Sequence, residues 1–230
     1  MSVQFPIPVV DDLFEPPVLA VVSRLNEEPT HLPPEEQCFV ARASRNRRME
    51  FATGRQCARW LLRRLGVDAP ALQADSDRCP IWPAGTVGSI AHADDLCIVA
   101  AAPSALVAGV GVDVEPDEEL ERDLWPIVCT GQEREWLDTQ PVSLQGRLVR
   151  LLFCAKEAVY KCWFPRARRF LSFQEVGIRL DLPQGRFRAE LSHAAMIPNG
   201  VGQWVGRWLI SGRWVFAGIV DSEVSAAAAA

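Results

Sequence analysis

Gly109-Val110-Gly111-Val112-Asp113-Val114-Glu115 is an apolar stretch that ends in two carboxylates separated by one residue. It predicts the end of a β-strand that runs over 106–114. Because successive side chains of a strand alternate, Asp113 and Glu115 point to the same side, and Val114 can present its backbone carbonyl there. Two carboxylates and a carbonyl are hard oxygen ligands that suit Mg²⁺. The alternative is a strand end that carries its two charges into solvent.

A second stretch, Phe153-Cys154-Ala155-Lys156-Glu157-Ala158-Val159-Tyr160-Lys161, lies in a segment over 145–164 that predicts a helix. The apolar stripe of this helix consists of Leu148, Leu151, Leu152, Ala155, Val159 and Cys162. Glu157 and Lys161 lie nearly opposite the stripe. One interpretation is an exposed ion pair, which stabilises a helix by about 0.2–0.5 kcal/mol. Three aromatic residues share the Glu157 flank, namely Phe153, Tyr160 and Phe164. Their presence favours an apolar-rimmed cleft or a domain interface.

Arginines are concentrated in one segment of the chain. Eight of the 24 basic residues lie between positions 42 and 64, namely Arg42, Arg45, Arg47, Arg48, Arg55, Arg59, Arg63 and Arg64. The segment 41–65 predicts a helix. Arg48 and Arg55 project from one face of it, and Arg47 lies close enough to join them. A solvated helix face is one interpretation, and a phosphate-binding cluster is the other, because guanidinium groups suit phosphate.

The composition excludes several classes of protein. With 230 residues, 49% of them hydrophobic and 23% charged, the chain is typical of globular proteins and permits one large domain or two small ones. A net charge of −5 gives no overall attraction for nucleic acid. Seven cysteines without a C-x-x-C pair argue against a disulfide framework and a zinc site. We find no candidate membrane span and no secretion signal, and therefore expect a cytoplasmic protein.

The order of the expected elements indicates an α+β protein. A proline-rich leader over 1–40 is expected to have little regular structure. Further strands are expected at 87–91, 96–102, 176–182, 186–191, 204–210 and 214–220, and a further helix at 131–137. The order of helix followed by strands occurs twice, so we expect two similar halves, 1–104 and 105–224, and a disordered alanine tail at 225–230.

Taken together, these motifs resemble those of a known family. The pattern G-V-D-V-E followed by F-C-A-K-E-A-V-Y-K is similar to that of the 4′-phosphopantetheinyl transferases that serve peptide and polyketide synthases. The segments 52–59, 82–92 and 163–165 resemble the branch of enterobactin synthase component D and the surfactin-type enzymes. The resemblance covers about 42–220, with five motifs in the order and spacing of the family.

The resemblance implies a fold, an activity and a metal. The fold has two similar α/β halves in a pseudo-twofold arrangement with a cleft between them. The activity transfers the phosphopantetheine arm of coenzyme A to a serine of an apo carrier protein, and adenosine 3′,5′-bisphosphate leaves. By resemblance, Asp113, the Val114 carbonyl, Glu115 and Glu157 hold Mg²⁺, or Mn²⁺ in its place. A divalent cation would neutralise charge that builds on the pyrophosphate.

The resemblance also implies roles for single residues. Asp113 and Glu157 are catalytic, Glu157 as the base that takes the serine proton, and Lys161 contacts the transferring phosphate. Lys156 is a second cation near that phosphate. Arg47 and Arg55 grip the phosphates of the coenzyme.

Three further residues are assigned to the coenzyme. His92 matches a histidine that meets the ribose 3′-phosphate, although a capped loop histidine is the alternative interpretation. Arg78 lies in the loop where related sequences often have a lysine near the adenine 3′-phosphate, and Asp75 and Asp77 oppose its charge. Ala91 stands where a hydroxyl residue often precedes the histidine.

The expected partner is an apo carrier protein, or a carrier domain, of a peptide, polyketide or fatty-acid synthase. Such carriers are typically acidic, so the basic segment 165–171 is a candidate docking site, although a solvated turn after a helix is its alternative. A monomer is expected. Two other functions stay open, namely a coenzyme A or carrier-binding protein without catalysis and a metal-dependent phosphohydrolase.

Overall fold

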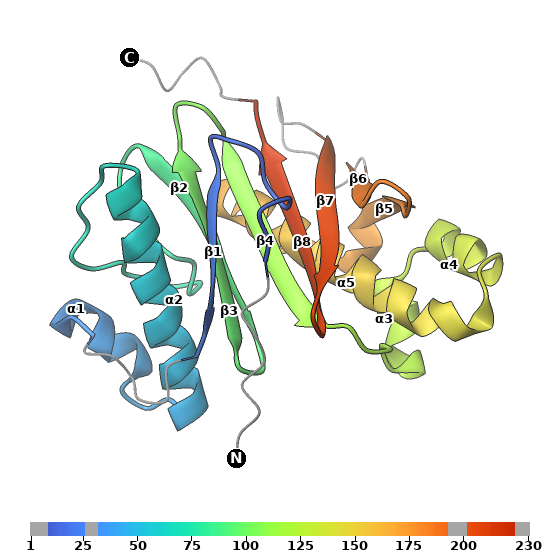
Figure 1. Ribbon diagram of the computed structural model, residues 1–230, viewed down its shortest axis with the longest axis horizontal. Helices are drawn as coiled ribbons and strands as arrows, with labels where there is room; N and C mark the ends of the chain where they lie inside the picture. Colours follow the sequence, from blue (N-terminus) through green and yellow to red (C-terminus); the bar gives the residue numbers. More distant parts are fainter. Residues whose placement is uncertain (1–8, 26–31, 193–201, 224–230) are drawn as a thin grey trace.

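The computed structural model describes residues 9–25, 32–192 and 202–223, and the alanine tail lies outside these residues. It contains a mixed α+β fold with two antiparallel sheets (Figure 1). One sheet has three strands in the order β1-β3-β2, and the other has five in the order β4-β8-β7-β6-β5. The expected α+β class is confirmed.

The three-stranded sheet is built from β1 (Leu19–Arg24), β2 (Thr86–Ala93) and β3 (Leu96–Pro103). The helix α2 (Arg45–Arg64) packs against it, beside the short helices α1 (Pro34–Gln37) and η1 (Cys38–Val40) (Figure 1). The expectation of little regular structure over 1–40 is wrong for β1, which pairs with β3 from Leu19↔Ala101 to Arg24↔Leu96. The arginine-rich helix begins later than expected, because Ser44 caps its first turn by accepting from the Arg47 N–H.

The five-stranded sheet contains β4 (Gly109–Pro116), β5 (Val176–Asp181), β6 (Arg186–Leu191), β7 (Gln203–Ser211) and β8 (Trp214–Asp221). The helical elements of this part are η2 (Arg122–Leu124), α3 (Trp125–Val128), α4 (Gly131–Asp138), α5 (Val142–Ala167) and η3 (Phe173–Glu175). All strands and helices expected in this part are present, with bounds that differ by a few residues. The expected apolar stripe of α5 is buried throughout.

Two faces of β4 pack against different layers. Val110, Val112 and Val114 are buried in a core that they share with the N-terminal segment and β8. The odd-numbered residues face α5, and a Cβ atom at Gly111 would lie 1.9 Å from the backbone oxygen of Ala158. Only glycine therefore permits α5 to approach this strand so closely. The same close approach brings Asp113 and Glu115 to side chains of α5.

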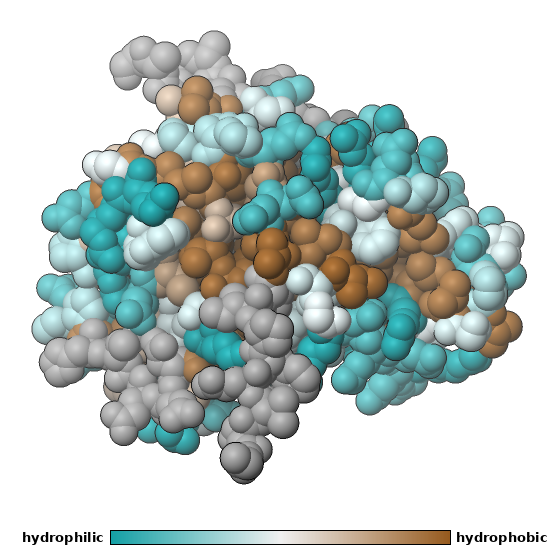
Figure 2. Space-filling model, viewed as in Figure 1, coloured by the Kyte–Doolittle hydropathy of each residue, from teal (hydrophilic) through white to brown (hydrophobic). Residues whose placement is uncertain are grey.

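A side chain joins the two sheets. Ser89 of β2 accepts a hydrogen bond of 3.1 Å from the backbone N–H of Val112 on β4, and the two strands lie side by side (Figure 1). In the same view, hydrophobic residues gather across the middle of the molecule between hydrophilic areas (Figure 2). This arrangement places the end of β2 next to the acidic end of β4.

The remaining expectations from composition can be compared with the structure. All seven cysteines are free thiols, five of them buried, as expected for a chain without a disulfide framework. Across the described ranges, none of the helices combines the length and apolar character that a membrane span requires.

Candidate active site

Asp113 and Lys161 form the centre of the candidate site. Lys161 Nζ lies 2.5 Å from Asp113 Oδ1, and the Asp113 side chain is only 5% exposed. Burial lowers the pKa of Lys161, but the carboxylates of Asp113 and Glu157 outweigh it and raise this pKa above its usual range. The other oxygen, Asp113 Oδ2, is buried and has no hydrogen-bond partner. A buried carboxylate oxygen without a donor is an acceptor for an incoming cation or proton donor.

Glu157 lies one helical turn before Lys161 and is partly buried rather than solvated. Burial raises the pKa of Glu157, the Lys161 ammonium opposes this shift, and the Asp113 carboxylate adds to it. The interpretation of Glu157 and Lys161 as an exposed surface pair is therefore wrong. The raised pKa makes the carboxylate of Glu157 a stronger proton acceptor than an exposed glutamate.

Glu115 lies on the same face of β4 as Asp113, as the alternation of the strand predicts. Arg150 of α5 donates to Glu115 Oε2 at 2.9 Å. Burial and the neighbouring Asp113 carboxylate raise the pKa of Glu115 to about 7, although Arg150 and Lys161 act in the opposite direction. A cation bound between Asp113 and Glu115 would relieve this repulsion.

A cationic cluster from the other sheet approaches this centre. Arg47 Nη1 lies 2.8 Å from His92 Nε2 and 3.0 Å from Glu50 Oε2. Burial lowers the pKa of His92, Glu50 raises it, and Arg47 and Lys161 lower it further. Lys161 of α5 is thus within electrostatic range of His92 on β2. The structure brings together predicted residues that are far apart in the sequence.

Arg55 is more deeply placed than a solvated helix face would allow. Its side chain is buried, its Nε donates to the Leu72 carbonyl at 2.7 Å, and its guanidinium stacks 4.4 Å from the centre of the Phe51 ring. Burial lowers its pKa to about 10. Arg55 remains a cation at neutral pH, in a position fixed by its neighbours.

Arg78 lies in the loop between α2 and β2, where it is exposed and has a φ of 64°. The acidic neighbours expected to oppose it, Asp75 and Asp77, both lie near Arg168 at the end of α5. A partner for these two acids was not expected from the sequence, because 93 residues separate Arg168 from Asp75.

Two of the residues predicted to contact the coenzyme, Lys156 and Ala91, are buried in the structure. Lys156 is fully buried and donates to Glu133 and to the carbonyls of Val128 and Phe173, at 2.7–2.9 Å. Its ammonium is therefore saturated by structural partners and is not available to a phosphate. Ala91 is 2% exposed and packs in the apolar core, and its side chain supplies no hydrogen bond in place of the hydroxyl residue of related sequences.

The predicted basic docking segment is also different from expectation. Arg166 is bound to Asp221, Arg168 to Asp75, and Arg169 to Glu175. These ion pairs neutralise its positive charge. Phe170 is 73% exposed, and its ring lies 6.2 Å from that of Tyr160. The surface beside Glu157 is therefore aromatic rather than basic.

A small apolar cavity opens next to Glu157. It has a volume of about 260 Å³, and its lining includes Tyr160, Phe170, Leu171 and Phe173. The Tyr160 ring also stacks on Phe164, with ring centres 5.2 Å apart. The expected apolar rim around Glu157 is present, and it could accept a thin, flexible ligand.

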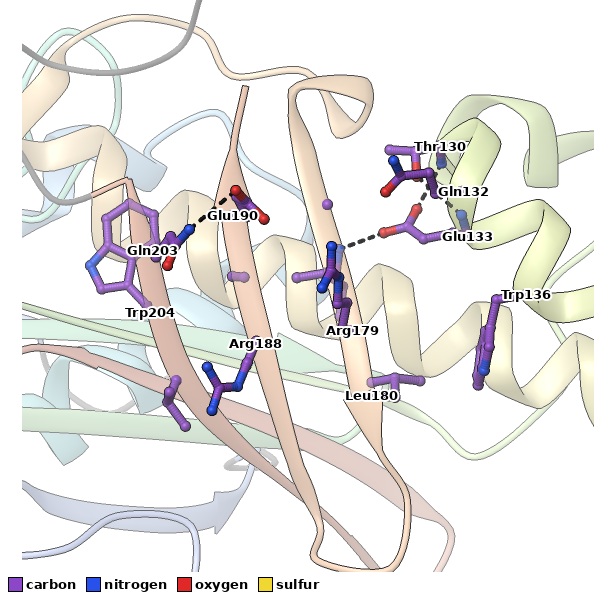
Figure 3. A pocket seen from close by; sticks show the side chains of 14 residues that line it. Thr130, Gln132, Glu133, Trp136, Arg179, Leu180, Arg188, Glu190, Gln203 and Trp204 are labelled. Atoms are coloured by element: carbon purple, nitrogen blue, oxygen red, sulfur yellow. Dashed lines mark hydrogen bonds between the residues drawn. The ribbon is translucent and has the colours of Figure 1, made fainter. Parts of the chain in front are cut away.

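A larger groove of about 640 Å³ lies between α4 and strands β5, β6 and β7 (Figure 3). Trp136, Arg179, Arg188 and Glu190 line it, and no predicted site residue does. Its buried acid, Glu133, already accepts from Lys156, from the Thr130 N–H and from the Ile178 N–H. The groove therefore offers no buried acid that is free to act as a base.

The described side chains were also compared with the needs of a metal ion. Within 9–25, 32–192 and 202–223, no three His, Cys, Asp or Glu side chains are grouped so that they could hold a metal. Asp113 contacts Lys161, and Glu115 contacts Arg150. The orphaned Asp113 Oδ2 and the raised pKa values of Glu115 and Glu157 are nevertheless the features that a divalent cation would satisfy.

Comparisons with known proteins identify the family of the chain. Residues 35–102 match the model of the 4′-phosphopantetheinyl transferase N-terminal domain, and residues 109–204 match that of the 4′-phosphopantetheinyl transferase superfamily. The chain is 35% identical to the 4′-phosphopantetheinyl transferase Npt of Nocardia iowensis, over 81% of this chain and 87% of the relative. It is 38% identical to Svp of Streptomyces mobaraensis, over 86% and 79% of the two chains.

A more distant relative is enterobactin synthase component D of Salmonella typhi, which is 35% identical over 54% of this chain and 51% of its own length. The two family models match consecutive parts of the chain, and both include residues of the candidate site. The chain belongs to the 4′-phosphopantetheinyl transferase superfamily.

Proposed function

We propose that the protein transfers the 4′-phosphopantetheine arm of coenzyme A to a serine of an apo carrier protein at the Asp113–Lys161 centre. The observation that carries this assignment is the position of Lys161, which contacts Asp113 and is within electrostatic range of both Glu157 and His92. Acidic, basic and proton-accepting groups of β4, α5 and β2 therefore lie within electrostatic range of Lys161. Phosphoryl transfer is catalysed mainly by such positioning and charge stabilisation.

Coenzyme A is held between two halves of the chain in this proposal. Residues 1–104 supply Arg47, Arg55, Arg78 and His92 for the phosphates, and residues 105–224 supply the acidic residues and Lys161. Support comes from the end of β3 at Pro103 and the start of β4 at Gly109, which leave a short connection between the halves. We further propose that the halves are related by pseudo-twofold symmetry with a cleft between them, and that the protein is a cytoplasmic monomer.

A divalent cation, Mg²⁺ or Mn²⁺, is part of the proposal. As the resemblance implies, Asp113, Glu115, Glu157 and the Val114 carbonyl would hold it, although among the described residues these side chains are not grouped around one point. The orphaned oxygen of Asp113 supports this assignment, because it is a hard ligand without a partner. When bound, the cation would neutralise charge on the pyrophosphate of the coenzyme.

The side chains of this protein carry the proton and the charge during transfer. Glu157 accepts the proton of the serine hydroxyl as the serine oxygen forms a bond to phosphorus. The bond from that phosphorus to the leaving phosphate oxygen breaks, and adenosine 3′,5′-bisphosphate departs with the bonding electron pair. Lys161 stabilises the negative charge on the transferred phosphate.

The pantetheine arm extends into the apolar cavity beside Glu157 in this arrangement. The cavity is lined largely by aromatic and aliphatic side chains, among them Tyr160, Phe170 and Leu171. An arm enclosed there would place its phosphate near Lys161 and leave Glu157 open to the serine. The aromatic surface at Phe170 would then lie where the carrier protein arrives.

The test mixes the purified protein with coenzyme A, Mg²⁺ and an apo carrier protein, and mass spectrometry follows the carrier. The expected result is the mass increase of one phosphopantetheine group. Glu157→Gln should lower the rate by a factor of about 10²–10⁴ and still bind coenzyme A, since it removes the base and leaves Lys161 and the arginines that hold the phosphates. The matched control is Glu135→Gln, an exposed position on α4.

The other outcomes of this experiment separate the alternatives. Binding of coenzyme A without any mass increase on several carriers would indicate a binding protein without catalysis. Release of the bisphosphate without a carrier would indicate a phosphohydrolase. A Glu157→Gln variant with the parental rate would show that another group accepts the proton.

A further inference from the structure

The loop that carries Arg78 is attached to the opposite part of the molecule by one arginine. We propose that Arg168 is a positioning residue, which compensates one of the two negative charges of Asp75 and Asp77 and thereby allows the 74–80 loop to bind the 3′-phosphate of coenzyme A through Arg78. This inference rests on the proposed function, since it assumes that coenzyme A is the ligand.

Asp75 organises the loop from within. Its Oδ1 accepts hydrogen bonds of 2.9 Å from the backbone N–H groups of Asp77 and Cys79. The Asp75 N–H donates to the Cys79 carbonyl at 3.0 Å, and an isolated β-bridge pairs Ala74 with Pro80. One carboxylate oxygen is thus used for the shape of the loop, and Oδ2 is left for an external partner.

That partner comes from the end of α5. Arg168 caps the helix in a left-handed conformation with a φ of 52°, and its backbone N–H donates to the Phe164 carbonyl at 2.9 Å. From there Arg168 Nη1 contacts Asp75 Oδ2, and it lies 3.8 Å from Asp77 Oδ2. The guanidinium also lies over the Phe164 ring, 5.8 Å from its centre. Both ends of the contact are therefore held by local structure.

The loop lies between two elements of the candidate site. Burial is the main cause that lowers the pKa of Arg55. Cys79 of the loop has a smaller effect and raises this pKa. Burial and Glu157 raise the pKa of Tyr160, and Asp77 and Cys79 add to that rise. The loop is therefore within electrostatic range of α2 on one side and of α5 on the other.

Charge explains why this contact matters for an anionic ligand. Asp75 and Asp77 both precede the one basic residue of the 74–80 segment, Arg78. With Arg168 in place, one of these two negative charges is compensated by an ion pair. Without it, both carboxylates would repel a phosphate group that approaches Arg78. The ion pair itself is partly exposed, since the Arg168 side chain is 48% accessible, so we expect its effect on overall stability to be small.

The test compares Arg168→Gln with the parent protein by calorimetric titration of coenzyme A. We expect binding to weaken, and KM for coenzyme A to rise, by about fivefold, with kcat unchanged. Arg207→Gln is the matched control, because Arg207 also binds a carboxylate, that of Glu15, from a distant part of the chain. It should leave both parameters unchanged.

A second ligand distinguishes an electrostatic effect on phosphate binding from a loss of folded protein. Dephospho-coenzyme A lacks the 3′-phosphate, so Arg168→Gln should bind it as well as the parent protein does. Removing the two acids as well, in the triple variant with Asp75→Asn and Asp77→Asn, should restore the affinity for coenzyme A. The substitution Asp75→Asn keeps a side-chain oxygen that can accept from the two loop N–H groups. If Arg168→Gln does not fold, Asp75→Asn with Asp77→Asn in the parent background should bind coenzyme A at least as tightly as the parent.

Two results would overturn the inference. One is an unchanged affinity of Arg168→Gln for coenzyme A, and the other is an equal loss for coenzyme A and dephospho-coenzyme A. Either result would leave the proposed function intact, provided that the parent protein modifies its carrier. Failure of the parent protein to bind coenzyme A at all would instead refute the proposed function.

Discussion

Lys161 of α5 and Asp113 of β4 are joined by a contact of 2.5 Å, although 48 residues separate them in the chain. The contact leaves Asp113 with one oxygen paired and one without any partner. Lys161 is therefore both a structural counter-ion and a group that faces the candidate substrate site. These two roles can be separated by experiment.

Lys161→Met should destabilise the protein by about 2 kcal/mol, because the buried Asp113 carboxylate loses its cation. It should also abolish transfer. Thermal unfolding with and without Mg²⁺ measures the first effect. If Mg²⁺ binds at Asp113, it should raise the melting temperature of the variant more than that of the parent protein. An equal response of the two proteins would argue against a metal at this carboxylate.

Gly111→Ala should destabilise the fold by about 3 kcal/mol. The new methyl group would lie 1.9 Å from the Ala158 oxygen, which is backbone and has little room to move. Gly131→Ala is the control, because nothing lies within 4 Å of a Cβ atom there. This position is the first residue of α4, and we expect the control to be neutral or slightly stabilising. Chemical denaturation of both variants measures the difference.

The pH dependence of coenzyme binding should involve His92. Burial, Arg47 and Lys161 keep its pKa below the usual 6.5 in the free protein, despite the opposing effect of Glu50. His92 therefore stabilises the fold above pH 6.5, and this contribution is lost as the pH falls through the lowered pKa. A bound phosphate would favour the protonated ring, so binding should take up protons near pH 6.5.

Calorimetry of coenzyme A binding in buffers of different ionisation enthalpy measures this proton uptake. His92→Gln should eliminate it and should weaken binding. Uptake that persists in His92→Gln would mean that another group, such as Glu115, is protonated on binding.

Lys156→Met should destabilise the protein by about 3–5 kcal/mol, because it leaves Glu133 buried without its cation. KM for coenzyme A should change little in the protein that remains folded, because Lys156 lines the cavity beside Glu157 but its ammonium donates to Glu133 and to two carbonyls. Thermal unfolding and steady-state kinetics together test this prediction. If the KM for coenzyme A rose while the stability stayed unchanged, the result would show that Lys156 contacts the coenzyme.

Local patterns predicted most of the fold. The alternation at the end of β4 correctly placed Asp113 and Glu115 on one face, and the helical period of α5 correctly gave its buried stripe. The strand β1 was missed because its apolar residues follow a proline-rich leader. Its sequence, Leu-Ala-Val-Val-Ser-Arg over 19–24, contains the branched residues that are typical of strands.

The partners of charged residues could not be predicted in the same way. Lys156 and Lys161 are five positions apart on one helix, yet one is bound to Glu133 and the other to Asp113. The difference depends on which elements pack against each side of α5, and that is set by contacts between distant segments. The pairing of Arg168 with Asp75 has the same origin. A pattern within one segment contains no information on such pairs.

The absence of a side chain at Gly111 has a consequence for how this enzyme can diverge. Helix and strand lie so close together there that a side chain at position 111 would push α5, which carries Glu157, away from the strand that carries the acidic pair. Mutation cannot re-aim one of them without displacing the other. New carrier preferences must therefore arise in the loops that surround this helix and strand, while the reaction chemistry is inherited unaltered.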